Sequence, residues 1–128
     1  MKHLILTSAI VAAFAAPVGA ETLTIGTATA QTGGLAYADV PTMQGMKLAI
    51  DEINAAGGID GATKIALLEK DVRSDPAQTS IAAQELADAG VSVIVLPGDS
   101  DPALAAIGVV SSAKIPAIST VASSPTLP

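Results

Sequence analysis

Residues 91–96 have the sequence VSVIVL and run directly into residues 97–102, PGDSDP. A short run this apolar, without strict alternation of polar and apolar residues, predicts a strand that is buried on both faces. The Asp-Pro pair at its end is a helix start signal, because Asp can cap a helix and Pro fits the first helical position. The segment therefore predicts a buried strand, a loop and a helix beginning at Asp101-Pro102.

The same strand-and-helix unit recurs on both sides of this segment. Further apolar runs predict strands at residues 23–28, 65–68 and 115–118. A second helix is predicted from Asp75-Pro76 to Gly90, with Gln78 at the third helical position as in a capping box.

A helix is also predicted between the first two strands. Apolar residues recur there every three or four positions, as on one buried helix face, and a glycine pair then ends the helix; the residues are Met43, Met46, Ile50 and Ile53, followed by Gly57-Gly58. Strands and helices thus alternate along the chain. With right-handed crossovers, this order predicts an α/β fold: a doubly wound parallel sheet in a three-layer αβα arrangement.

Ligands of doubly wound sheets bind beyond the carboxyl ends of the strands, so the loops there are the candidate site. Ser100 stands at a helix start, where backbone N–H groups can bind a carboxylate, although Ser is also an ordinary cap there. Ser124-Pro125 predicts a second helix start beside the first. Tyr37 follows the first strand and offers a flat apolar face with a hydroxyl; a partly buried loop tyrosine is the alternative.

The composition argues against several classes of function. The 128-residue chain has 12 acidic and 6 basic side chains and is 2% aromatic, whereas nucleic-acid binding needs clustered basic residues and stacking surfaces. It has no cysteine, and its one histidine is His3. A Ser-His or Cys-His pair therefore cannot form once residues 1–20 are removed, and no G-x-G-x-x-G motif is present. We expect no enzyme activity, no cofactor, no metal and no nucleic-acid partner.

Two segments of the chain contain closely spaced aspartates, residues 99–101 and 71–75. Asp99 and Asp101 can in principle act as paired carboxylates or bind a hard cation, but we interpret Asp101 as a helix cap and Asp99 as an exposed loop charge. Residues 71–75, DVRSD, are expected to form a solvated loop with a surface ion pair.

Residues 1–20 have the pattern of a secretory signal peptide. Lys2 supplies the positive charge, residues 4–16 the apolar run, and residues 18–20 the small side chains of a cleavage site. The run is short for a membrane span, which needs about 20 residues; an uncleaved anchor is the alternative. We predict cleavage after Ala20 and a periplasmic protein, with residues 21–128 forming the folded domain.

Residues 22–128 resemble the periplasmic leucine/isoleucine/valine-binding proteins of ABC transporters. The most specific match is AIDEINAAGGI at residues 49–59, supported by Asp75-Pro76 and by residues 115–119 and 123–127. The resemblance implies a type I periplasmic binding fold with two lobes that close on an amino acid. Because family members are more than twice as long, residues 21–128 are expected to be an incomplete N-terminal lobe.

The resemblance also implies a function and a set of contacts. The function is that of the substrate-binding component of an ABC importer, which delivers a branched-chain amino acid or similar small carboxylate to a permease in the inner membrane; the alternative is a ligand-sensing domain of the same fold. Ser100 and Ser123 match hydroxyl residues that hold the ligand carboxylate. The carbonyl of Val121 matches an acceptor for the ligand ammonium, and Tyr37 falls within one position of a pocket aromatic residue. Asp99 and Asp101 depart from the family pattern.

Overall fold

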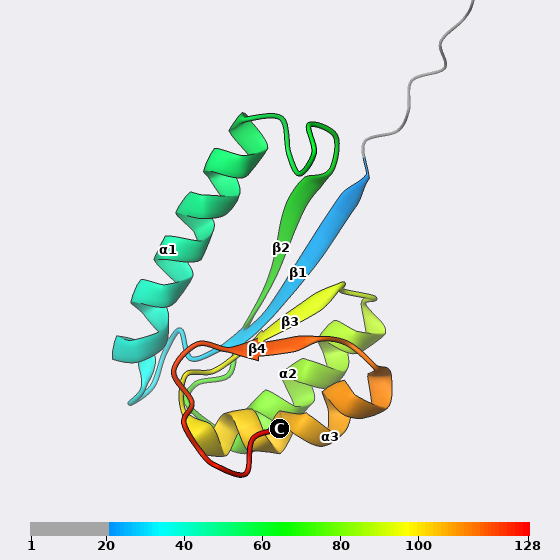
Figure 1. Ribbon diagram of the computed structural model, residues 1–128. Coiled ribbons are helices and arrows are strands. Elements are labelled where there is room, and N and C mark those ends of the chain that lie inside the picture. Colours follow the sequence, from blue (N-terminus) through cyan, green and yellow to red (C-terminus); the bar gives the residue numbers. More distant parts are fainter. Residues whose placement is uncertain (1–20) are drawn as a thin grey trace, which may run out of the picture.

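The computed structural model describes residues 21–128, which form four strands and three helices (Figure 1). The predicted signal peptide and its cleavage after Ala20 lie outside the described residues. Along the chain the elements are β1 (Thr22–Thr29), α1 (Ala36–Ala55), β2 (Lys64–Asp71), α2 (Pro76–Asp88), β3 (Val93–Leu96), α3 (Ser100–Ala113) and β4 (Ala117–Ser119). The four predicted strands and the three helices predicted between them are therefore present, with changes at the ends.

The four strands form one parallel sheet in the order β2-β1-β3-β4. The strand order reverses direction at β1, so α1 crosses to one side and α2 and α3 cross to the other. Figure 1 shows α1 on one face of the sheet and the α2–α3 pair on the opposite face. The predicted doubly wound, three-layer α/β fold is confirmed. None of the helices within residues 21–128 is long and apolar enough to cross a membrane.

The main core lies between the sheet and the α2–α3 layer. Leu86 of α2 and Ile94 of β3 are fully buried there. The two helices meet through small side chains, since Ala83, Ala103 and Ala106 are also fully buried. With a single tyrosine as the only aromatic residue in this part of the chain, close packing of Ala, Val, Ile and Leu replaces large aromatic contacts.

The local start and stop signals explain where α1 ends and where α2 begins. Gly57 and Gly58 follow α1 with φ of 115° and 98°, in the left-handed region that glycine accepts at little cost. Asp75 caps α2 by accepting a hydrogen bond from the Gln78 N–H at 2.8 Å, and Pro76 occupies the first position. Both predictions are confirmed.

The predicted start of α3 is wrong. The helix begins at Ser100, and Asp99 is its cap, with an extended backbone and its carboxylate 2.9 Å from the Ser100 N–H. Pro102 then occupies the third helical position, where a backbone N–H has no intrahelical partner in any case. Asp101 is consequently an exposed residue of the first turn rather than the cap.

The last predicted helix start, at Ser124-Pro125, is a turn within the described residues. The Leu127 N–H donates to the Ser124 carbonyl at 3.1 Å, and the Ser124 hydroxyl pairs with Thr126. The apolar stripe predicted for α1 also ends earlier than expected, because Ile53 is 38% exposed.

Asn54 turns toward β2 in place of Ile53. Its side-chain amide donates to the Ile65 carbonyl and accepts from the Ile65 N–H, both at 2.8 Å. Since β2 is an edge strand, these backbone groups have no neighbouring strand on that side. The asparagine amide satisfies them and fixes the end of α1 against the sheet edge.

Candidate functional site

The loops that follow β1, β3 and β4 converge at the carboxyl edge of the sheet, where the sequence predicted a site. Gly98, in the loop after β3, marks the point of closest approach. A Cβ atom at this position would lie 3.0 Å from Asp39 Oδ1 and 3.4 Å from Val121 Cβ. Asp39 of α1 and Val121 of the loop after β4 therefore both lie close to the β3–α3 loop.

Ser100 and Ser123, which match the carboxylate-holding hydroxyl residues implied by the family resemblance, are brought into contact. Ser100 Oγ accepts hydrogen bonds from the N–H groups of Ser123 at 3.3 Å and Ser124 at 3.2 Å. Both bonds use the Ser100 oxygen as acceptor, so its hydroxyl proton can still be donated to another group. Both are also at the long end of the hydrogen-bond range, so an anionic oxygen can compete for the same N–H groups.

The structure places the other two predicted site residues at the surface. Val121 is 60% exposed, and its carbonyl accepts no hydrogen bond from residues 21–128. Tyr37 lies in the first turn of α1 rather than in a loop, and it is 78% exposed. The alternative of a partly buried loop tyrosine is therefore wrong. No hydrogen bond within residues 21–128 connects Tyr37 to Ser100 or Ser123.

Asp39 is a residue of this edge that the sequence analysis missed. It lies in the first turn of α1 and is only 4% exposed. Its Oδ2 accepts from the Ala30 N–H at 2.7 Å, and its Oδ1 accepts from the Gly98 N–H at 2.8 Å. The helical periodicity contained the signal, because Asp39 stands four residues before Met43 on the same apolar stripe. An acidic residue on a buried helix face is a candidate for a structural or functional role.

Asp71, at the end of β2, holds the loop after β1. It accepts hydrogen bonds from the Gln31 and Thr32 N–H groups, the Thr32 hydroxyl and the Arg73 N–H, at 2.6 to 3.1 Å. Burial works to raise the pKa of this carboxyl, but the four hydrogen bonds outweigh burial and hold the pKa below its ordinary value of 3.8.

The surface ion pair predicted for residues 71–75 is not formed. Within residues 21–128, the ion pairs are Lys47–Glu69 and Lys70–Glu85, and neither involves that segment. The reason is that the Asp71 carboxylate oxygens are occupied by neighbouring hydroxyl and backbone N–H groups.

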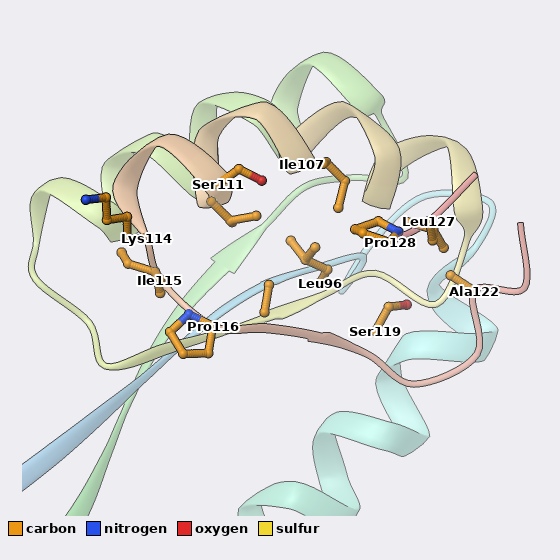
Figure 2. Close-up of a pocket in the computed structure, with 12 residues that line it drawn as sticks. Leu96, Ile107, Ser111, Lys114, Ile115, Pro116, Ser119, Ala122, Leu127 and Pro128 are labelled. Carbon is orange, nitrogen blue, oxygen red and sulfur yellow. The ribbon is translucent and has the colours of Figure 1, made fainter. Parts of the chain in front are cut away.

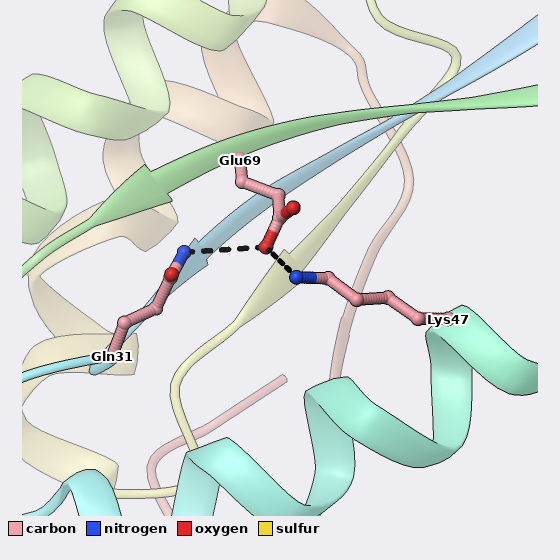
Figure 3. A network of polar contacts seen from close by, with 3 residues as sticks. All are labelled: Gln31, Lys47 and Glu69. Carbon is pink, nitrogen blue, oxygen red and sulfur yellow. Dashed lines mark hydrogen bonds and ion pairs between the residues drawn. The ribbon is translucent and has the colours of Figure 1, made fainter.

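A polar network reinforces the same loop from the side of α1. Glu69 of β2 pairs with Lys47 of α1 at 2.8 Å and accepts from the Gln31 side chain at 3.4 Å. Figure 3 shows both contacts reaching the same Glu69 oxygen. Because Lys47 is half exposed, the ion pair adds little stability, and its main effect is to connect the loop to a strand and a helix.

The loops after β1 and β2 approach each other so closely that only glycine fits at one position. Gly33 has a φ of 90°, and a Cβ atom there would lie 2.5 Å from the Arg73 carbonyl oxygen. Ser74 binds the same loop by accepting from the Leu35 N–H at 2.9 Å and donating to the Thr32 carbonyl at 3.2 Å. The segment that carries Tyr37 into α1 is thus anchored on β2 and its following loop.

A separate cavity of about 450 Å³ lies between α3 and β4 (Figure 2). Its walls combine apolar side chains, such as Leu96, Ile107 and Leu127, with the polar residues Ser111, Lys114 and Ser119. They contain none of the four predicted site residues. The cavity is therefore distinct from the Ser100–Ser123 contact. Within residues 21–128, no three acidic or histidine side chains come together as metal ligands.

Comparisons with known proteins place this architecture in a family. The sequence profile described as periplasmic binding protein matches residues 22–128. No curated protein matches the chain. Among solved structures, the chain is similar to the branched-chain amino acid transporter substrate binding protein LivJ from Streptococcus pneumoniae in complex with isoleucine. The two are 36% identical with a TM-score of 0.79, over 83% of this chain and 30% of that chain.

Two further structures show the range of ligands in such proteins. A solute binding protein of an ABC transporter from Rhodopseudomonas palustris BisB5, in complex with 3,4-dihydroxy benzoic acid, is 32% identical with a TM-score of 0.71, over 79% of this chain and 27% of that chain. An ABC transporter substrate-binding protein from Desulfitobacterium hafniense, in complex with Leu, is 28% identical with a TM-score of 0.70, over 82% of this chain and 30% of that chain.

This chain therefore spans between 27% and 30% of the length of these three solved proteins. These relatives are substrate-binding or solute-binding proteins of transporters. The family profile covers almost all of the described residues, and the parallel four-stranded sheet matches the solved structures. The chain belongs to the periplasmic binding protein family and has the α/β architecture of a type I periplasmic binding protein.

Proposed function

We propose that this chain is part of the substrate-binding component of an ABC importer. The whole protein captures a branched-chain amino acid or a similar small carboxylate in the periplasm and delivers it to a permease in the inner membrane. Residues 1–20 direct its export and are cleaved after Ala20. The observation that carries the proposal is the contact of Ser100 Oγ with the Ser123 and Ser124 N–H groups at the carboxyl edge of the sheet.

The ligand carboxylate binds at this contact. It accepts the Ser100 hydroxyl proton and takes over the Ser123 N–H, both of which favour a charged acceptor over a neutral one. Ser100 is the first residue of α3, so the positive end of the helix dipole adds to the attraction. The ligand therefore replaces the long Ser123–Ser100 hydrogen bond by a charge-assisted bond and gains a second one from the Ser100 hydroxyl.

The acidic residues around the site favour a ligand that also carries a positive charge. Asp99 and Asp101 flank Ser100, and Asp39 lies behind the same loop. A plain carboxylate is repelled by these charges, whereas an amino acid places an ammonium among them. The Val121 carbonyl, which has no hydrogen-bond donor within residues 21–128, is the acceptor for that ammonium. Tyr37 covers the ligand from the side of α1.

The proposal is tested by calorimetric titration of the protein at its native length with leucine, isoleucine, valine and 3,4-dihydroxybenzoate. We expect at least one amino acid to bind and the aromatic acid to bind more weakly. Ser100→Ala should weaken binding of that amino acid by about 10-fold to 100-fold, since it removes a hydrogen bond to a charged group.

Ser111→Ala is the matched control for this titration. Ser111 is an exposed serine of the same helix, and it lines the cavity between α3 and β4. We expect this variant to bind as the wild type does. Amino-acid binding that is unchanged in Ser100→Ala, or that is lost in Ser111→Ala, would place the ligand elsewhere and overturn the proposal.

A further inference from the structure

The Asp39 carboxylate is a buried charge without a cationic partner. It is 4% exposed, and no ion pair within residues 21–128 involves it. Burying a carboxylate is costly unless hydrogen bonds compensate for the lost water. An apolar residue at this position would extend the buried stripe of α1 without that cost. We therefore expect the carboxylate to have a role that depends on its ability to accept hydrogen bonds, which an apolar side chain lacks.

The two compensating hydrogen bonds join loops that are far apart in the sequence. Ala30, the donor to Oδ2, directly follows β1, whereas Gly98, the donor to Oδ1, follows β3 and is 59 residues away from Asp39. Their lengths of 2.7 and 2.8 Å are typical of charge-assisted bonds. One carboxylate thus fixes the spacing between the ends of two neighbouring strands.

The Gly98 bond acts on the loop that carries Ser100. Gly98 stands two residues before Ser100, and the preceding carbonyl, that of Pro97, accepts from the Ser119 hydroxyl of β4 at 2.7 Å. The loop is therefore held by α1 on one side and by β4 on the other. The absence of a side chain at Gly98 matters here, because a Cβ atom would lie only 3.0 Å from Asp39 Oδ1.

We propose that Asp39 is a positioning residue for ligand binding: its carboxylate sets the place of Ser100 relative to the first turn of α1, which also carries Tyr37. This inference rests on the proposed function. Asp39 does not touch the ligand. It acts through the Gly98 N–H, so that both walls of the site are fixed before the ligand arrives and less ordering is needed on binding.

The test uses Asp39→Asn in the protein at its native length. Asparagine keeps the size of the side chain but presents an NH₂ group to one of the two N–H donors, so one bond is lost. We expect leucine affinity to fall about tenfold. Asp51→Asn is the matched control, because Asp51 is an exposed residue of the same helix whose side chain makes no hydrogen bond within residues 21–128; its affinity should change less than about twofold.

A double-mutant cycle separates positioning from general destabilisation. If Asp39 acts by placing Ser100, its substitution should have little further effect once the Ser100 hydroxyl has been removed. We therefore expect Asp39→Asn to weaken binding much less in the Ser100→Ala background than in the wild type. Equal effects in the two backgrounds, or unchanged affinity in Asp39→Asn, would overturn the inference.

A measurement on the unmodified protein covers the case in which the variant does not fold. The amide protons of Ala30 and Gly98 should show downfield NMR shifts and slow hydrogen exchange, as expected for donors to a buried carboxylate. Fast exchange at both amides would overturn the inference. If the wild type binds no amino acid while both amides are protected, the proposed function fails and the connection between the loops stands.

Discussion

Asp71 accepts four hydrogen bonds at the end of β2, although its side chain lies at the surface. All of these bonds favour its ionised form. Three of them come from Gln31 and Thr32, in the loop between β1 and α1, so ionisation of a single carboxyl group is coupled to the order of that loop. Asp39 and Asp71 both accept hydrogen bonds from backbone N–H groups, but only Asp39 is buried.

The lowered pKa of Asp71 predicts a pH dependence of stability. Because the folded-state pKa lies below the ordinary value of 3.8, ionised Asp71 stabilises the folded state above that value, and this contribution is lost as the pH falls through the lower folded pKa. Urea unfolding of the wild type and of Asp71→Asn should therefore differ most at pH values well above 3.8, and the two should converge as the pH falls through the lowered pKa of Asp71. The effect is small, since solvent screens an exposed group.

Asp51→Asn serves as the control for Asp71→Asn, because it removes one exposed carboxylate without removing hydrogen bonds to the loop. It should show no comparable convergence. A difference between wild type and Asp71→Asn that stays constant over the whole pH range would contradict the role assigned to the ionised carboxylate.

At the scale of single elements, the cap of α2 can be tested. Asp75→Ala removes the acceptor of the Gln78 N–H, and we expect the free energy of unfolding to fall by about 1 kcal/mol. Asp75→Asn keeps an equally good cap and should cost much less. Denaturant unfolding of the native-length protein gives both values, and equal losses in the two variants would show that α2 does not depend on this hydrogen bond.

The elements themselves could be predicted because their signals are local. Apolar runs indicated the strands, and Asp75-Pro76 and Gly57-Gly58 marked helix ends that the structure confirms. The start of α3 could not be decided locally, because Asp99 and Asp101 are both acceptable caps for a helix near Ser100. In the folded chain, Asp99 is the cap. The loop that contains it is also held by residues distant in the sequence, which form hydrogen bonds with Gly98 and Pro97.

The candidate site was predicted only in part, because only some of its residues leave a signal in the sequence. The rule that ligands bind at the carboxyl ends of parallel strands singled out Ser100, and the family resemblance added Ser123; the structure brings the two into contact. Asp39 was missed because its partners are backbone N–H groups of Ala30 and Gly98, which leave no pattern in the sequence. The exposed position of Tyr37 likewise depends on where α1 begins.

At the scale of the whole molecule, the parallel sheet directs the loops after its strands toward one edge (Figure 1). Two regions compete as places for a ligand: the Ser100–Ser123 contact at that edge, and the cavity between α3 and β4. The first offers N–H and O–H donors for a carboxylate at the positive end of the α3 helix dipole, whereas the second combines apolar walls with Ser111 and Lys114. We therefore expect the ligand carboxylate to bind at the Ser100–Ser123 contact.

The most direct test is a crystal structure of the native-length protein with a bound branched-chain amino acid. We expect one carboxylate oxygen to lie within about 3 Å of Ser100 Oγ and of the Ser123 N–H, with the ammonium facing the Val121 carbonyl. A ligand found in the cavity between α3 and β4, with Ser100 Oγ still accepting from Ser123 and Ser124, would contradict it.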